Sequence, residues 1–180
     1  MTLSQTDAQK ISDAVLVINA CLPDSKLGLP DDIFYLVSRL TPMINVDLLI
    51  VNERNEKLLT WREDQFYGPG WHIPGGIIRF KELVETRIAK VAELELGTSV
   101  TWESQPVLIR EITNPNRDVR GHFISMVYKC KLTSPLRSED EASSTEQILN
   151  GQWRWFTKMP SNMIRPHFQF EELFNSTIYY

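Results

Sequence analysis

Residues 70–97 read GWHIPGGIIRFKELVETRIAKVAELELG, and this segment constrains the architecture more than any other. A Pro-Gly-Gly turn at residues 74–76 precedes Glu82, and a run with helical spacing then ends at Gly97. Glycine often ends a helix in the left-handed conformation, so we expect a helix over residues 82–96 capped by Gly97. Glycines in the turn let backbone approach a ligand closely, which makes the Gly75 carbonyl a candidate metal ligand.

The register of turn, helix and terminal glycine resembles the Nudix box, a loop-helix motif that holds a divalent metal against a diphosphate. Two positions that usually carry metal-binding carboxylates in that motif are Val91 and Leu94 here, and Lys90 stands where an arginine is usual. Glu95 is the remaining carboxylate of the set, so the resemblance implies that Glu95 is a metal ligand. Its ordinary alternative is a surface glutamate near a helix end.

The chemistry of a diphosphate explains why such a site needs a metal. The negative oxygens of a diphosphate resist attack, and a bound Mg²⁺ offsets their charge. Mg²⁺ takes one or two carboxylates together with water and phosphate oxygens. We therefore expect Mg²⁺ as the cofactor, with Mn²⁺ as an alternative. Glu82, at the expected start of the helix, is interpreted as structural because a carboxylate there satisfies free backbone N–H groups.

Helical and extended patterns alternate along the rest of the chain. Apolar spacing predicts helices over residues 3–21, from residue 29 to before Pro42, and over 165–174, and strands over 44–51, 56–62, 106–112, 122–132 and 153–156. The polar turn at residues 52–55 predicts a hairpin between the first two strands. The apolar run at residues 14–21 is interpreted as the buried face of the first helix. This order of elements predicts an α+β fold in which a mixed β-sheet lies between helices, α/β/α.

Composition places the chain among soluble globular proteins. Its 180 residues are 42% hydrophobic and 23% charged. The resemblance to the Nudix box implies a Nudix hydrolase domain over residues 28–180, preceded by a helical extension over residues 1–27. The net charge of −4 argues against nucleic-acid and membrane partners, which need a basic surface. Cys21 and Cys130 match no metal or redox spacing, so we interpret them as reduced thiols of a cytoplasmic protein.

The pattern of missing carboxylates is similar to that of one Nudix subfamily, the GDP-mannose mannosyl hydrolases, and the similarity extends over roughly residues 29–180. It implies a homodimer that binds a nucleotide sugar as its small-molecule substrate. The site that it implies comprises Arg62, His122 and Asp47 as catalytic residues, Phe34, Arg62 and Lys90 as substrate-binding residues, and Gly75, Glu95 and Gln147 as metal ligands.

Three of these assignments have ordinary alternatives. Without a functional role, Arg62 would be an exposed arginine on a strand, His122 a half-buried histidine on a strand, and Gln147 a polar residue of a loop. The sequence departs from the subfamily at two further positions. In that subfamily a histidine follows the loop glutamine and acts as general base, and an arginine follows the double glycine, whereas this chain has Ile148 and Ile77 there.

Loss of a general base typically costs about 10²- to 10⁴-fold in rate, so another group must take the role if the protein is an enzyme. His167, His72 and Asp47 are the candidates. Three functions therefore stay open: Mg²⁺-dependent hydrolysis of a nucleoside-diphosphate sugar to nucleoside diphosphate and free sugar, binding of a nucleotide sugar without turnover, and conventional pyrophosphatase chemistry. The single remaining carboxylate favours the first, because stabilising a departing diphosphate needs only one metal.

Overall fold

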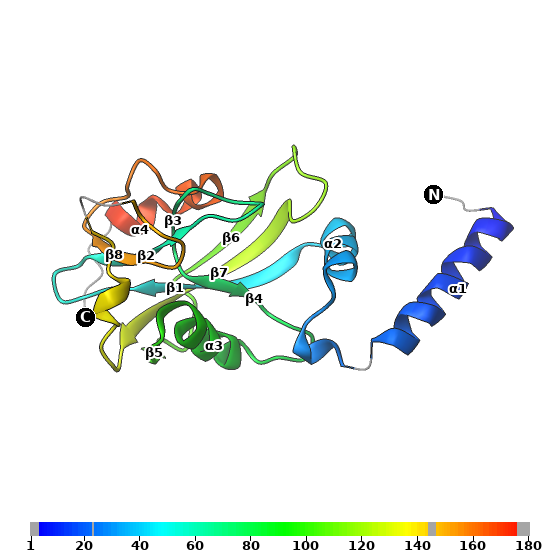
Figure 1. The fold of residues 1–180 in the computed structure, drawn as a ribbon, viewed down its shortest axis with the longest axis horizontal. Helices are drawn as coiled ribbons and strands as arrows, with labels where there is room; N and C mark the ends of the chain where they lie inside the picture. The colour runs from blue at the N-terminus through cyan, green and yellow to red at the C-terminus, as the bar shows by residue number, and fades with distance from the viewer. Residues whose placement is uncertain (1–3, 23, 144–146, 176–180) are drawn as a thin grey trace.

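The computed structural model describes residues 4–22, 24–143 and 147–175 (Figure 1). Its α-helices are α1 (Gln5–Cys21), α2 (Asp31–Leu40), α3 (Val84–Leu96) and α4 (Glu172–Asn175), and its 3-10 helices are η1 (Ser25–Leu27), η2 (Ser138–Asp140) and η3 (Arg165–Phe170). Its strands are β1 (Met43–Ile50), β2 (Lys57–Arg62), β3 (Gly70–His72), β4 (Gly75–Ile77), β5 (Val100–Trp102), β6 (Leu108–Thr113), β7 (His122–Leu132) and β8 (Trp153–Phe156).

The strands form two sheets. The larger has the order β4–β1–β7, and both β5 and β6 pair with β7. β1 and β7 are parallel while the other pairs are antiparallel, so this sheet is mixed as predicted. The smaller sheet has the order β3–β2–β8 and is antiparallel throughout. Helix α3 lies against β1 and β4, while η3 and α4 lie on the other side of the molecule (Figure 1).

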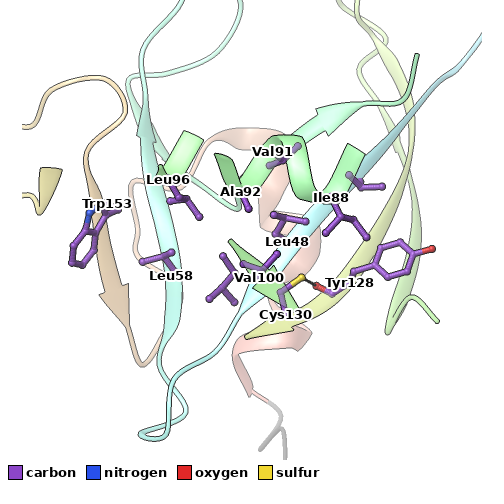
Figure 2. Close-up of a cluster of buried hydrophobic side chains, with 12 residues drawn as sticks. Leu48, Leu58, Ile88, Val91, Ala92, Leu96, Val100, Tyr128, Cys130 and Trp153 are labelled. Carbon is purple, nitrogen blue, oxygen red and sulfur yellow. Dashed lines mark hydrogen bonds between the residues drawn. The ribbon is translucent and has the colours of Figure 1, made fainter. Parts of the chain in front are cut away.

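Alternation along β1 divides its side chains between two hydrophobic clusters. Val46, Leu48 and Ile50 belong to the cluster under α3, where they pack with Ile88 and Val91 (Figure 2). Leu49 and Val51 belong to the second cluster, which η3 and α4 cover. Burying each such aliphatic side chain contributes about 1.5–3 kcal/mol. Hydrophobic side chains therefore pack on both faces of β1, and this packing fixes the position of the polar residues within the strand.

The structure corrects two expectations about elements. β1 and β2 do not form a hairpin within one sheet, because β1 pairs with β4 and β7 while β2 pairs with β3 and β8. The bridge between Val51 and Lys57 and the hydrogen bond from the Asn52 amide to the Glu56 carbonyl close the turn that links the two strands. The apolar run of the first helix is not a buried face either, because α1 has no buried residue and Leu16 is 66% exposed. Within the described residues, no helix is long and apolar enough to cross a membrane.

The sequence also did not predict β3, β4 or β5. Each is three residues long, too short for an alternation of apolar and polar residues to show. The C-terminal helix predicted over residues 165–174 is instead a 3-10 segment, η3, followed by the short α4. The predicted helix over residues 82–96 is confirmed as α3, although it begins at Val84, and Gly97 caps it with φ 61° and ψ 26° in the left-handed region.

Candidate active site

A cavity of about 770 Å³ opens where α2, α3 and η3 meet strands of both sheets. Strand pairing brings its polar residues together. Asp47 on β1 lies opposite Gly75 on β4, and Thr60 on β2 lies opposite His72 on β3. The last turn of α3 adds Glu95 to the same cavity. Residues far apart in the sequence thus meet through strand register and the placement of one helix.

Asp47 is a buried carboxylate in the middle of the central sheet. Its exposed fraction is 1%, and Oδ2 accepts hydrogen bonds from Asn45 Nδ2 at 2.8 Å and from the Ser125 hydroxyl. Burial raises the pKa of Asp47 to about 7, although these two hydrogen bonds and the positive charge of Arg62 act in the opposite direction. Both hydrogen bonds reach Oδ2. Oδ1 instead lies against Gly75, where a Cβ atom would come within 2.2 Å of it.

Glu95 faces the same turn from the helix. The Gly75 amide donates to Glu95 Oε1 at 3.3 Å, and the Glu95 side chain is 30% exposed. Burial raises the pKa of Glu95 to about 8; the hydrogen bond from Gly75 and the charge of Arg62 oppose that rise, and the charge of Asp47 adds to it. Asp47 and Glu95 therefore both face the Gly75 turn, and burial favours the neutral form of both carboxyl groups.

Two neutral histidines lie beside Asp47 and Glu95, which together form the acid pair of this site. His72 Nε2 lies 2.9 Å from the Thr60 hydroxyl and 3.8 Å from Glu95 Oε2. Burial lowers the pKa of His72 to about 3, with the charge of Arg62 acting in the same direction. His167 Nδ1 accepts the Ile73 amide at 3.1 Å, and burial lowers the pKa of His167 well below its usual value. Because Nδ1 is an acceptor, the proton of neutral His167 is on Nε2.

Arg62 is held at the cavity wall by a carboxylate of the following loop. Its Nε and Nη2 both lie 2.6 Å from Asp64 Oδ2. The other Asp64 oxygen accepts the Phe66 and Tyr67 amides at 2.7 and 2.8 Å, which fixes the loop after β2. The guanidinium lies 5.0 Å from the centroid of the Tyr67 ring. Arg62 is thereby oriented in advance, with 26% of its side chain exposed for a ligand.

Of the residues implied by the sequence, five line the cavity: Phe34, Asp47, Arg62, Gly75 and Glu95. The structure does not bring the other three into it. Lys90 Nζ binds Glu82 at 3.0 Å, His122 Nε2 lies 2.9 Å from Glu111 on the exposed part of the sheet, and Gln147 is exposed away from the cavity.

Several cavity residues had no signal in the sequence. Tyr67 and Arg120 come from loops, and no spacing places these loops next to each other. Thr60 is part of a predicted strand, but its role became visible only through its pairing with His72. Ile148, at the position where a base was expected, packs against the second hydrophobic cluster instead of facing the cavity.

The donor atoms at the acid pair fit one Mg²⁺ with few protein ligands. Among the residues that the structure describes, no group of three or more His, Cys, Asp or Glu side chains is arranged to hold a metal. Mg²⁺ is commonly bound by one or two carboxylates, with water and substrate phosphates completing its six oxygens. Glu95, the Gly75 backbone and the neighbouring Asp47 are hard oxygen donors of this kind beside an open cavity. Mg²⁺ would also offset the charge of the acid pair.

Comparison with protein families gives a match over most of the chain. Residues 41–167 match the model of the NUDIX domain. The chain is 35% identical over 108 residues to the low-salt glycan biosynthesis protein Agl8 of Haloferax volcanii, covering 58% of this chain and 68% of that protein. It is 30% identical over 108 residues to the ADP-ribose pyrophosphatase of Methanocaldococcus jannaschii, covering 59% of this chain and 62% of that protein.

Solved structures show the same fold at lower identity. The MutT protein of Methanosarcina mazei Go1 has a TM-score of 0.56 at 20% identity and covers 75% of this chain and 94% of its own. A UDP-X diphosphatase has a TM-score of 0.52 at 20% identity and covers 97% of this chain and 83% of its own. These likenesses concern the arrangement of helices and strands, and the chemistry rests on the site.

Proposed function

Because the chain belongs to the Nudix family, we propose that its cavity hydrolyses a nucleoside-diphosphate sugar, of the GDP-mannose type, to a nucleoside diphosphate and a free sugar. The observation that carries this proposal is the small number of carboxylates that helix α3 supplies to the metal site. Val91 is 2% exposed in the hydrophobic core and Leu94 contributes an aliphatic side chain to the cavity, so Glu95 is the one metal-directed carboxylate that α3 supplies to the cavity. A single metal suffices when its task is to stabilise a departing diphosphate.

Each of these cavity residues has its own role in the proposed reaction. Glu95 and the Gly75 carbonyl would hold Mg²⁺ or Mn²⁺, and the bound ion would supply the positive charge that offsets the leaving diphosphate. Arg62 binds the same diphosphate through its free guanidinium edge. Phe34 presents an aromatic surface in the cavity wall for the nucleoside. Water then attacks the anomeric carbon of the sugar with inversion.

Asp47 is the best-placed group to take the proton of that water. Both of its hydrogen bonds reach Oδ2, which leaves Oδ1 directed at the Gly75 turn. The two histidines are less suited, because His167 Nδ1 is occupied by the Ile73 amide and His72 Nε2 by the Thr60 hydroxyl. Asp47 therefore supplies the base that the sequence comparison had expected at position 148.

The names of the two relatives favour different bonds. The Haloferax relative is named for glycan biosynthesis, in which nucleotide sugars are the usual donors, and this supports the proposed substrate class. The Methanocaldococcus relative is named a pyrophosphatase, which favours cleavage between the two phosphorus atoms as the second candidate. Binding without turnover is the third candidate, and Ile148, which packs against the second hydrophobic cluster where a base was expected, favours it.

Product analysis separates the three candidates. The protein is incubated with Mg²⁺ and a panel of nucleotide sugars in water enriched in ¹⁸O. Nucleoside diphosphate and ¹⁸O-labelled free sugar are expected. Nucleoside monophosphate and sugar phosphate would overturn the proposal in favour of pyrophosphatase chemistry, and saturable binding without products would leave only the binding function.

Replacement of Glu95 tests the metal site directly. Glu95→Gln is expected to abolish Mg²⁺-dependent turnover, because the amide removes the negative charge that attracts the ion. Glu93→Gln is the matched control, since Glu93 is exposed on the same helical turn. Turnover is followed at several Mg²⁺ concentrations in both variants. Equal activity of the two variants would remove Glu95 from the mechanism.

A further inference from the structure

Three arginines lie around the ring of Tyr67, one of the residues that line the cavity. The guanidinium carbons of Arg62, Arg117 and Arg120 lie 5.0, 4.2 and 5.8 Å from the centroid of Tyr67. Asp64 forms a salt bridge with Arg62. Within the part of the chain that the structure describes, neither Arg117 nor Arg120 forms a salt bridge. Arg120, which lines the cavity, therefore brings to it a positive charge that no salt bridge of the described residues pairs.

Arg120 is the member of this group that combines access to the cavity with an unused donor. It lines the cavity, and its Nε is buried without a hydrogen-bond partner. Phe66 and Phe34 cover the guanidinium, with ring centroids 4.8 and 5.4 Å from its central carbon. A guanidinium stacked on aromatic rings can still bind through its N–H edge, which matches the oxygens of a phosphate.

The backbone holds Arg120 in position before any ligand arrives. Its amide donates to the Ser38 hydroxyl at 3.1 Å, and its carbonyl accepts the Tyr67 hydroxyl at 2.9 Å. Its φ of 53° lies in the left-handed region, which costs a non-glycine residue about 1 kcal/mol. The loop between β6 and β7 is thus fastened to α2 and to the loop after β2 (Figure 1).

We propose that Arg120 is a second diphosphate-binding arginine, which grips the substrate together with Arg62 from the loop between β6 and β7. This inference rests on the proposed function, since it concerns the same nucleotide ligand. The chain has Ile77, an aliphatic residue in the cavity wall, where the related subfamily has an arginine. Arg120 supplies a positive charge to this cavity from a different element.

Calorimetric binding tests this role without turnover. GDP, ADP and UDP are titrated into the full chain in the presence of EDTA, and each corresponding nucleoside is titrated separately. Arg120→Gln is expected to weaken binding of the diphosphate that binds best by about 10- to 100-fold, the range for a charge-assisted contact, and to leave nucleoside binding unchanged. Arg120→Lys is expected to restore part of the loss, because it keeps the charge without the planar edge.

Arg117→Gln is the matched control, because Arg117 stacks on the same ring but does not line the cavity. It is expected to change diphosphate affinity less than about threefold. Equal losses for nucleoside and diphosphate in Arg120→Gln would show that Arg120 contacts the base, and would overturn the proposal. Unchanged diphosphate affinity in that variant, or no diphosphate binding by the unaltered chain, would also overturn it. Formation of nucleoside monophosphate in the product analysis would reject the proposed reaction but not this site.

Discussion

Val91 and Leu94 replace carboxylates of the Nudix box in two different environments. Val91 is 2% exposed and belongs to the hydrophobic cluster under α3 (Figure 2). Its Cγ2 also lies 2.8 Å from where a Cβ on Gly76 would be, so the space around it is filled. Leu94 is 75% exposed and lies at the edge of the cavity. A carboxylate at position 91 would thus be buried in the hydrophobic core, whereas one at position 94 would face solvent and the substrate cavity.

Restoring each carboxylate should therefore give opposite results. Val91→Glu is expected to lower the free energy of unfolding by at least about 3 kcal/mol, because it buries an unpaired charge. Leu94→Glu is expected to change it by less than about 0.5 kcal/mol, and to tighten Mg²⁺ binding because the ion gains a nearby anion. Urea unfolding and Mg²⁺ titration measure the two effects. Wild-type stability of Val91→Glu would contradict the packing of α3 described above.

Asp47 is the residue on which turnover most depends in the proposed reaction. Asp47→Asn keeps an oxygen for the donors Asn45 and Ser125 but removes the proton acceptor. We expect kcat to fall by about 10²- to 10⁴-fold, with little change in nucleoside-diphosphate affinity. Asp118→Asn is the control, because Asp118 is exposed on a loop. A fall in kcat of less than tenfold would assign the base to another group.

Helix α3 begins beside a buried carboxylate that links the preceding loop to the helix. Glu82 accepts the Arg79 amide at 2.9 Å, Arg87 Nη2 at 2.6 Å and Lys90 Nζ at 3.0 Å, and its side chain is 6% exposed. Burial alone would raise the pKa of Glu82, but these donors outweigh it and lower that pKa from 4.5 to about 2. Glu82 is thus structural, as expected, but not by capping the helix: α3 has no side-chain cap, and Glu82 binds the Arg79 amide before the helix and two cations on it.

The depressed pKa of Glu82 predicts how stability depends on pH. The unfolded chain takes up the proton first, so the stabilisation is complete above pH 4.5 and is lost as pH falls towards 2. Glu82→Gln is expected to lower the free energy of unfolding by about 2 kcal/mol at pH 7. The difference from the unaltered chain should shrink between pH 4.5 and 2. Glu85→Gln, at an exposed position of the same helix, should show neither effect; a constant difference across this range would contradict the assignment.

Long periodic elements were predictable here, whereas the meeting of loops was not. The helix up to Gly97 and the strand of residues 122–132 carry enough residues for their periodicity to show. The three-residue strands β3 and β4 do not, yet β4 sets the pairing of Asp47 with Gly75 and β3 sets the pairing of Thr60 with His72. The family resemblance identified Glu95 and Arg62, which lie on a predicted helix and a predicted strand. Arg120 could not be identified in this way, because its place in the cavity depends on how two loops meet.

Helix α1 stands apart from both hydrophobic clusters of the molecule (Figure 1). Its apolar residues Ile11, Val15 and Ile18 recur three and four positions apart, so they share one side of the helix. Ile11 is 51% exposed and Val15 is 47% exposed. An apolar row of this kind commonly packs against a second helix, and we propose that α1 pairs with α1 of a second copy to form the homodimer expected from the sequence.

Removing α1 should therefore change the mass of the assembly and leave the fold intact. A chain lacking residues 1–22 is expected to sediment as a monomer, while the full chain sediments as a dimer. Val15→Asp should also give a monomer, because an aspartate in the apolar row places a charge between the two helices. The thermal midpoint of the shortened chain should stay within about 3 °C, since α1 contributes no residue to either core cluster. A dimer that survives both changes would locate the interface elsewhere, and a large fall in the midpoint would mean that α1 packs against its own domain.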